Sequence, residues 1–192
     1  MKSKIMLKTF FKVMIGNKKE MQRVIPKAYF NSVYDIDYKK LKEKGITCLL
    51  FDIDGTIAKV DDLNISDEIK QLFSNLKEFK IILISNNDSK RVLPVSKVLN
   101  VPSLYSAKKP TCQAYETALK MLKVRKKNAC MIGDQILTDI FGANNYGIYS
   151  ILVNQMSNQN NLHTKIAHIL QCLMIKKLRK KKLLEKNKFY MN

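Results

Sequence analysis

The chain has 192 residues, 35 of them Lys or Arg and 16 Asp or Glu, so its formal net charge at pH 7 is +19. This length favours a single domain, and a hydrophobic content of 46% can bury a core, which excludes wholesale disorder. Uncharged apolar runs stay well below the roughly 18 residues of a transmembrane helix, which excludes such a helix. Lys8 and Lys12 interrupt the apolar N-terminal run, so we expect no signal peptide.

The charge is concentrated at the two ends of the chain. Residues 1–23 carry a net charge of +6 and residues 165–192 a net charge of +8, whereas residues 24–164 carry only +5. Such arms favour a polyanionic partner, which is an anionic membrane surface, a nucleic acid or both. The alternative is that they are solvated tails that keep the protein soluble.

The cysteines and histidines predict neither disulfides nor a zinc site. His163 and His168 are five residues apart and have no Cys or carboxylate cluster beside them. Because no export signal is expected, the scattered cysteines are interpreted as reduced cytoplasmic thiols. They form no CxxC pair and stand at Cys48, Cys112, Cys130 and Cys172.

The first half of the chain predicts two strands and two helices. Residues 47–51 form a short apolar run after a glycine, which is typical of a buried strand. Apolar side chains then recur at helical spacing over 67–79, with Ser66 as a candidate N-cap. A second buried strand is predicted at 80–84. The next helix, over 88–99, contains Pro94, which must kink or shorten it.

The second half continues this alternation. The predicted elements are a strand at 101–105, a helix at 111–122, a strand at 129–132, a helix at 135–145 and a strand at 148–153. Apolar strands that alternate with helices indicate a parallel sheet covered on both faces. We therefore expect a doubly wound α/β domain over residues 26–155. A basic amphipathic extension (1–25) precedes it and a Lys-rich helical tail (156–192) follows it.

Polar side chains follow four of the predicted strands. They lie at Asp52–Thr56, at Ser85–Asn87, at Lys108–Pro110 and at Gly133–Asp139. In open α/β sheets, functional groups collect at the carboxyl ends of the strands, so these side chains should share one crevice. Clustered carboxylates with a single lysine need a cation, and oxygen ligands suit Mg²⁺ better than zinc.

Asp52 and Asp54 are two residues apart, so along a strand they would point to the same face. If the chain turns away at Gly55, Asp52 stays in the crevice and Asp54 hangs over it. One carboxylate could then attack phosphorus while the other moves protons. The backbone carbonyl of Asp54 could also reach the metal.

These segments, in this order, resemble the haloacid dehalogenase superfamily of phosphohydrolases. The resemblance implies that Asp52 is the nucleophile that forms an aspartyl-phosphate and that Asp54 is the general acid and base. Ser85 and Asn86 would hold the phosphoryl oxygens, and Lys109 would neutralise them. Mg²⁺ would be bound by Asp52, Asp54 and Asp134, with Asp139 in support.

Some of these assignments have alternatives. Lys108 competes with Lys109, although Lys109 adjoins Pro110 as in the Lys-Pro of the family. Ser85 could merely cap the segment that follows it, and Asp139 could be an ion-pair partner of Lys109 as well as a ligand. A second DxD pair ends at Asp37. It follows no buried strand and lacks Gly-Thr, so Asp37 is interpreted as a helix cap.

The spacing of the motifs leaves no room for a large cap domain. About 30 residues separate Asp54 from Ser85, and fewer separate Ser85 from Lys109, which resembles the capless subclass IIIA. A closer resemblance, to the YqeG-like and phosphatidylglycerophosphate phosphatase group, is carried by residues 25–30, 34–36, 41–46, 84–87 and 90–92, and residues 107–110 and 133–139 complete it. That group implies removal of phosphate from phosphatidylglycerophosphate to give phosphatidylglycerol.

Both ends of the chain suggest attachment to a membrane surface. Lys4, Lys8 and Lys12 share one face of a predicted helix, and apolar side chains lie largely elsewhere. A second apolar stripe precedes the basic run at 176–182. It comprises Ile166, Ile169, Leu170, Leu173 and Met174. Either stripe could instead pack on the domain.

We therefore expect a magnesium-dependent phosphomonoesterase in the cytoplasm, peripherally associated with the membrane and acting on a lipid. Two alternatives stay open: a phosphatase of a soluble phosphometabolite or polynucleotide end, and a basic RNA- or ribosome-binding factor on the same fold. The sequence does not indicate an oligomeric state.

Overall fold

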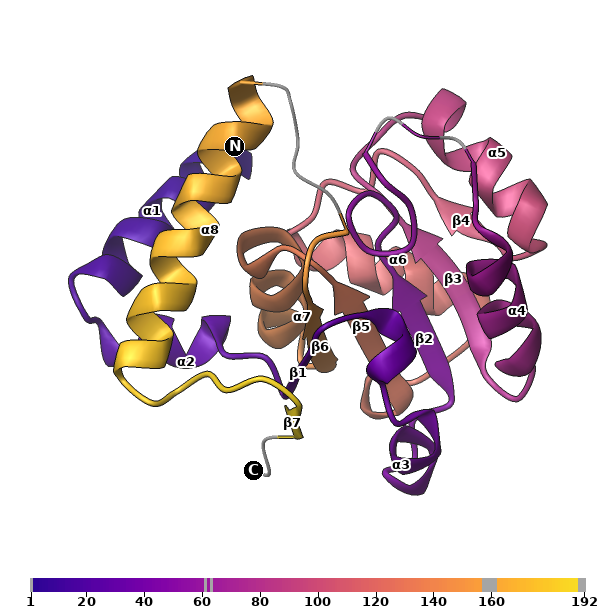
Figure 1. The fold of residues 1–192 in the computed structure, drawn as a ribbon, viewed down its shortest axis with the longest axis horizontal. Helices are drawn as coiled ribbons and strands as arrows, with labels where there is room; N and C mark the ends of the chain where they lie inside the picture. The colour runs from indigo at the N-terminus through magenta and orange to yellow at the C-terminus, as the bar shows by residue number, and fades with distance from the viewer. Residues whose placement is uncertain (1, 61, 63, 157–161, 190–192) are drawn as a thin grey trace.

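A mostly parallel β-sheet forms the centre of the protein. The computed structural model describes residues 2–60, 62, 64–156 and 162–189, and within them seven strands pair in the order β4-β3-β2-β5-β6-β1-β7 (Figure 1). All pairs are parallel except β1 with β7. The strands are β1 (Ala28–Phe30), β2 (Cys48–Phe51), β3 (Lys80–Ile84), β4 (Ser103–Leu104), β5 (Ala129–Gly133), β6 (Tyr149–Val153) and β7 (Lys188–Phe189).

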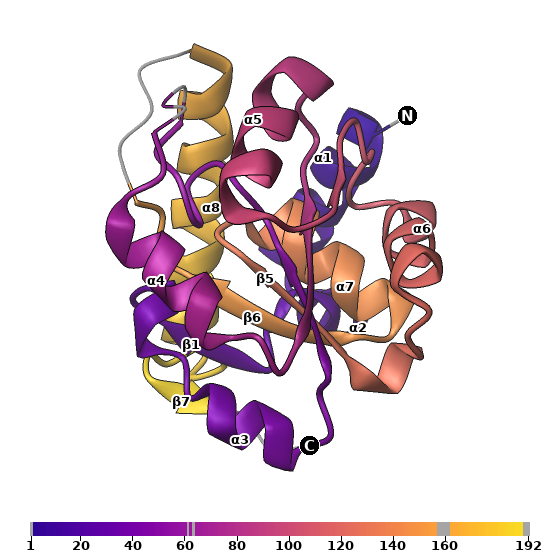
Figure 2. The same cartoon turned by 90° about the vertical axis from the view of Figure 1, so that its right-hand side faces the viewer.

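Helices cover both faces of this sheet (Figure 2). Alternate side chains of β2 go to opposite faces: Leu49 and Phe51 join one apolar cluster, and Leu50 joins another. The first cluster contains side chains of α3 (Tyr38–Glu43), α4 (Asp67–Asn75) and α5 (Ser89–Leu99). The second contains side chains of α6 (Cys112–Leu122) and α7 (Phe141–Tyr146). The doubly wound parallel sheet predicted from the sequence is thereby confirmed.

Three helices near the chain ends extend the second face beyond β6 and β1. They are α1 (Lys2–Met14), α2 (Lys18–Val24) and α8 (Leu162–Lys180), and α1 and α8 contact each other (Figure 1). Phe10 and Val13 of α1 are buried with Met174 of α8, in a cluster that also includes Tyr29 of the sheet. Part of each apolar stripe therefore packs on the body of the protein, which is the alternative that the sequence left open.

Several local predictions can be compared with the structure. Ser66 caps α4 by accepting a hydrogen bond from the Ile69 amide, and Asp37 caps α3 in the same manner, so both cap predictions are confirmed. The helix expected over 67–79 ends at Asn75. Pro94 does not shorten α5, which runs through it to Leu99. The helix expected at 135–145 begins with a π-type segment, η3 (Ile136–Ile140).

Other elements were not predicted. β1 has three residues and β7 two, which is too short for an alternating pattern to appear in the sequence. Two 3₁₀ turns, η1 (Val33–Asp35) and η2 (Lys126–Asn128), complete the description. In the described part of the chain, α4 is the one helix between β2 and β3, and no large cap is present. No described helix is both long and apolar enough to cross a bilayer.

Candidate active site

Three adjacent strands carry polar residues at their carboxyl ends. Asp52 follows β2 directly, Ser85 follows β3, and Asp134 follows β5. Because β3, β2 and β5 are neighbours in the sheet and run parallel, their ends meet at one edge. All three side chains are buried at this edge.

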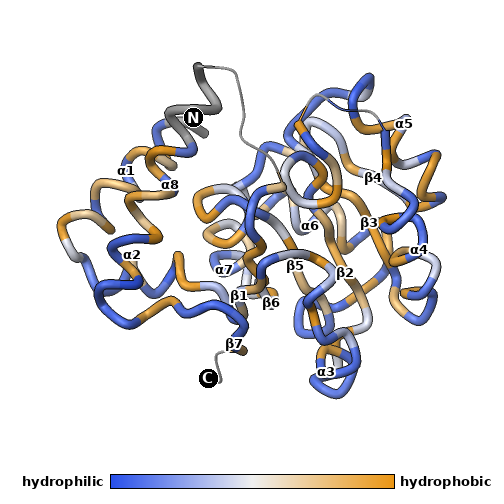
Figure 3. The backbone as a smooth tube through the Cα atoms, in the orientation of Figure 1, coloured by the Kyte–Doolittle hydropathy of each residue, from blue (hydrophilic) through white to orange (hydrophobic). Residues whose placement is uncertain are grey.

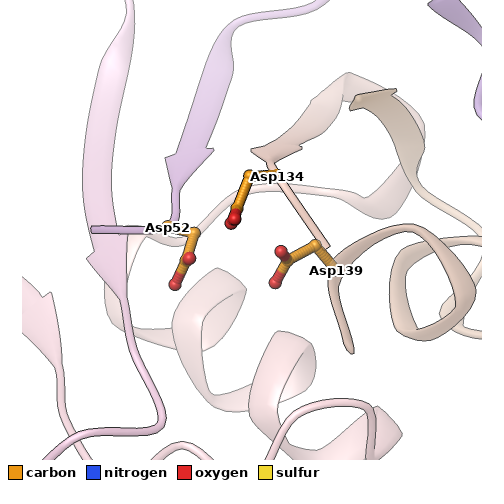
Figure 4. A group of neighbouring side chains, drawn as sticks. All are labelled: Asp52, Asp134 and Asp139. Carbon is orange, nitrogen blue, oxygen red and sulfur yellow. The ribbon is translucent and has the colours of Figure 1, made fainter. Parts of the chain in front are cut away.

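An acidic cluster occupies this edge. The carboxylates of Asp52, Asp134 and Asp139 offer oxygen atoms that all lie within 4.8 Å of one another (Figure 4). Asp139 reaches the cluster because it sits in the π-type segment η3, where its Oδ2 accepts a hydrogen bond from the Gln135 amide at 3.0 Å. Gly133 makes this approach possible, since a Cβ there would lie 2.4 Å from Asp139 Oδ2.

Lys109 supplies the positive charge of the cluster. Its Nζ lies 2.5 Å from Asp52 Oδ1 and 2.7 Å from Asp139 Oδ1, and its side chain is 2% exposed. Asn86 holds the backbone of Lys109: its Oδ1 accepts from the Lys109 amide at 2.7 Å, and its Nδ2 donates to the Lys109 carbonyl at 3.2 Å. Lys108 is exposed, so of the two candidate lysines it is Lys109 that contacts the acids.

Burial and mutual repulsion shift the pKa values in this cluster. Burial raises the pKa of Asp52 to about 6, although Lys109 opposes the shift. Burial also raises the pKa of Asp134 well above its ordinary value, and Asp52 and Asp139 add to the effect. For Lys109, burial lowers the pKa, but Asp139 and Asp52 outweigh it, so the net shift is upward and the ammonium stays charged.

The cluster fits a cation. Three carboxylates face one ammonium, which leaves an excess of negative charge in a buried space. Asp134 Oδ1 accepts from the Thr56 hydroxyl at 3.3 Å, but Asp134 Oδ2 is buried without a hydrogen-bond partner among the described residues. A buried carboxylate oxygen without a partner is costly, and oxygen-only ligands suit a hard divalent ion.

Asp54 points to a different set of partners. Its carboxylate pairs with the Arg91 guanidinium at 2.7 Å and accepts from Asn87 Nδ2 at 2.7 Å. Arg91 also donates to the Lys59 carbonyl. The carboxylate of Asp54 is therefore not part of the acidic cluster, whereas Asp139, expected only in support, belongs to it.

The contacts of Arg91 and Asn87 with Asp54 were not predicted from the sequence. Asp88, the residue after Asn87, is the N-cap of α5. Ser85 is buried, and its Oγ accepts a hydrogen bond from the Asn87 amide at 3.1 Å. This is the capping contact that the sequence left open, and it leaves the Ser85 hydroxyl proton available as a donor.

A second unpredicted contact comes from α8. Gln171 donates from Nε2 to the Asp134 carbonyl at 2.5 Å, and its Oε1 accepts from the Ile136 amide at 2.9 Å. One side chain thus bridges both ends of the turn between β5 and η3.

His168, one helical turn earlier, contacts Gln155 and Cys172, and the side chain of His163 lies outside those described.

The sequence of the chain is similar to those of known proteins. Residues 106–173 match the model of a family described as HAD-hydrolase-like. The chain is 29% identical over 159 residues to "Probable phosphatase YqeG" of Bacillus subtilis (strain 168), a match that covers 82% of this chain and 92% of the relative.

Solved structures were also matched. An uncharacterised protein from Listeria monocytogenes serotype 4b aligns with a TM-score of 0.49 and 17% identity, over 68% of this chain and 99% of the other. A haloacid dehalogenase-like hydrolase from Streptococcus pneumoniae aligns with a TM-score of 0.47 and 14% identity, over 58% and 88%.

Proposed function

The chain belongs to the haloacid dehalogenase superfamily of phosphatases, and from this premise we propose that it hydrolyses a phosphomonoester through an aspartyl-phosphate on Asp52. The observation that carries the proposal is the contact of Asp52 with a buried, charged Lys109. Beside them lies an Asp134 oxygen for which the described residues offer no hydrogen-bond partner. An ammonium next to a carboxylate nucleophile attracts a phosphoryl group and neutralises its charge in the transition state.

In the first step, an Asp52 oxygen forms a bond to phosphorus while the bond from phosphorus to the leaving oxygen breaks. Asp54 gives that leaving oxygen its proton, so the product departs as an alcohol. Asp54 then takes a proton from water, the water oxygen forms a bond to phosphorus, and the bond from phosphorus to Asp52 breaks. Inorganic phosphate leaves and Asp52 is regenerated. Ser85 and Asn86, with Lys109, hold the phosphoryl oxygens.

Asp52, Asp134 and Asp139 would hold Mg²⁺, and the backbone carbonyl of Asp54 is a further candidate ligand. When bound, the ion supplies positive charge that stabilises the phosphoryl oxygens. The residues of this chain then have separate tasks: Asp52 attacks, Asp54 transfers protons, and Lys109 binds the phosphoryl group.

The proposed substrate is phosphatidylglycerophosphate at an anionic membrane surface, as the sequence resemblance implies. A site without a large cap admits the phosphate of a lipid that stays in its bilayer. In this proposal, residues 26–155 form the phosphatase domain, and the flanking segments 1–25 and 156–192 bring it from the cytoplasm to the membrane.

The outer faces of α1 and α8 support membrane attachment. On α1, Leu7 and Phe11 are exposed next to Lys4 and Lys8, and Ile15, which directly follows α1, is exposed as well. On the neighbouring α8, Ile169 and Leu173 are exposed and Lys176 and Lys180 follow. Figure 3 shows that hydrophobic and hydrophilic stretches alternate along both helices. Exposed apolar side chains mixed with lysines are typical of surfaces that lie in a bilayer interface. We call these exposed residues of α1 and α8, together with Ile15, the outer helical face.

Phosphate release from a panel of monoesters tests the activity. The panel contains phosphatidylglycerophosphate in vesicles, soluble sugar and nucleotide phosphates, and a 5′-phosphorylated oligonucleotide, each with and without Mg²⁺. We expect the lipid to be the best substrate and chelation to abolish turnover. Preference for a soluble ester would contradict the lipid assignment and keep the phosphatase mechanism.

Asp52→Asn tests the nucleophile. The amide is nearly isosteric but cannot attack phosphorus, so turnover should fall by several powers of ten with the fold retained. Circular dichroism and thermal melting provide the control. Near-normal turnover by a folded Asp52→Asn protein would contradict the covalent mechanism.

Surface substitutions test the outer helical face better than truncation does, because α1 and α8 also pack into the core. Phe11 and Ile15 are 56% and 81% exposed, and Leu93 and Val98 of α5, at 50% and 51%, offer a matched control. Phe11→Ser with Ile15→Ser should weaken co-sedimentation with anionic vesicles, and Leu93→Ser with Val98→Ser should not. Equal effects of the two pairs would exclude this face as the membrane contact.

A further inference from the structure

A wide groove lies at the edge of the sheet opposite the acidic cluster. Its volume is about 1270 Å³, and its lining includes Lys27, Ile46, Lys127 and Ile148. These residues precede β1, β2, β5 and β6, whereas Asp52 follows the end of β2. Because these strands are parallel, the segments before and after them lie at opposite edges. The groove is therefore separate from the candidate active site.

The lining of this groove is strongly basic. Among the described residues that line it, none carries a carboxylate. Arg23 forms an ion pair with Glu20, so we attribute the excess positive charge of the groove to Lys19, Lys44, Lys126 and Lys127. The basic lining residues are Lys19, Arg23, Lys27, Lys44, Lys126 and Lys127.

The walls of the groove come from segments that are far apart in the sequence. Lys19 belongs to α2, Lys44 follows α3, and Lys126 and Lys127 belong to the 3₁₀ turn before β5. Lys126 Nζ lies 3.9 Å from the centre of the Tyr146 ring, a cation–π contact that holds this side chain on its wall. Leu183 also lines the groove, which brings the basic C-terminal segment close to it.

We infer that this groove binds the phosphate backbone of a nucleic acid, independently of sequence. Lysines that neutralise phosphates release counterions, and this effect supplies most of the non-specific affinity for nucleic acids. The groove exceeds the 300 to about 1000 Å³ of small-ligand pockets, so a chain of phosphates fills it better than a single small anion does.

A bilayer fits this groove less well. Insertion into lipid needs exposed apolar side chains, and none of the large exposed hydrophobic residues in the described part of the chain lines the groove. Those of α1 and α8 lie on the outer helical face instead. A flat membrane would also meet the rim of a concave surface rather than its walls, whereas a nucleic-acid strand can follow the groove.

Fluorescence anisotropy with the full-length protein tests the inference, with labelled single-stranded and duplex RNA as probes. Lys126→Glu with Lys127→Glu alters one wall, and Lys19→Glu with Lys44→Glu alters another. Lys77→Glu with Lys97→Glu, on exposed sites outside the groove, changes the net charge by the same amount. We expect each double substitution in the groove to lower the affinity for RNA at least tenfold at about 100 mM salt and to reduce the salt dependence of binding. The control double substitution should have a much smaller effect.

Several outcomes would overturn the inference. They are the absence of RNA binding by the wild-type protein, an equal loss of RNA affinity in the groove and control double variants, and binding of the wild-type protein to anionic vesicles but not to RNA. Thermal melting and turnover of a soluble phosphoester are measured for every variant, and both should match the wild type because the groove lies away from the acidic cluster. If one groove pair fails to fold, the pair on the other wall gives the result.

Discussion

Gln171 donates a hydrogen bond from its Nε2 to the backbone carbonyl of Asp134 at 2.5 Å. Because the Gln171 Oε1 also accepts from the Ile136 amide, helix α8 positions the turn that carries Asp134 and leads into η3, where Asp139 lies. The same helix presents Ile169 and Leu173 to solvent. In our proposal, helix α8 therefore contributes to the membrane-binding surface and also contacts the turn that binds the metal.

Gln171→Ala should weaken metal binding. Partners that orient a metal-binding segment commonly contribute tenfold or more to affinity. We therefore expect the variant to need about ten times more Mg²⁺ for the half-maximal rise in melting temperature and for half-maximal turnover. Lys176→Ala, an exposed change on the same helix, is the control. An unchanged Mg²⁺ titration of Gln171→Ala would mean that the contact is only structural packing.

Asp134→Asn should stabilise the metal-free protein and abolish its stabilisation by Mg²⁺. Asp134 Oδ2 is buried without a partner among the described residues, and the pKa of Asp134 is raised by burial. A raised pKa means that the folded state binds the carboxyl proton of Asp134 more tightly than the unfolded state does. The stability that this protonation contributes is therefore lost as pH rises above about 4, the ordinary range of a carboxyl group.

Thermal melting in excess chelator between about pH 4 and pH 8 checks this prediction. The wild-type protein should lose more stability than Asp134→Asn as pH increases, and Mg²⁺ should raise the melting temperature of the wild type only. A variant less stable than the wild type without metal would contradict it.

Gly55→Ala should destabilise the protein more than a backbone effect explains. Gly55 has φ +87°, and a Cβ there would lie 2.5 Å from Asp134 Oδ2. Gly16 has the same φ, and a Cβ there would meet no heavy atom within 4 Å. Gly16→Ala therefore measures the backbone strain, about 1 kcal/mol, and we expect Gly55→Ala to cost about 1–3 kcal/mol more in the free energy of unfolding. Equal costs in denaturant titrations would remove the steric explanation.

Arg91→Lys should lower kcat with little change in KM. The substitution keeps the positive charge but loses the guanidinium geometry that holds Asp54 and the Lys59 carbonyl together. If Asp54 protonates the leaving oxygen, the defect should be large, about tenfold to a hundredfold, for alkyl phosphates. It should be small for p-nitrophenyl phosphate, whose leaving group needs little protonation. Equal defects for both esters would argue against this role of Arg91.

Local sequence patterns were sufficient to predict the sheet and the acids at its edge. Strands β2, β3 and β5 consist largely of apolar residues, and Asp52, Ser85 and Asp134 directly follow them, so a local pattern was enough to predict their convergence. The caps at Asp37 and Ser66 were equally local, because each acts on an amide three residues away.

Which distant groups complete the site depends instead on how the helices and strands pack together. The pairing of Arg91 with Asp54, the bridge from Gln171 to Asp134 and the assembly of the basic groove join residues that no sequence period relates. Strand β7 likewise exists because β1 offers an open edge, not because two residues carry a strand signal. Local patterns encode backbone geometry and solvent exposure, whereas contacts between side chains on different elements depend on how those elements pack.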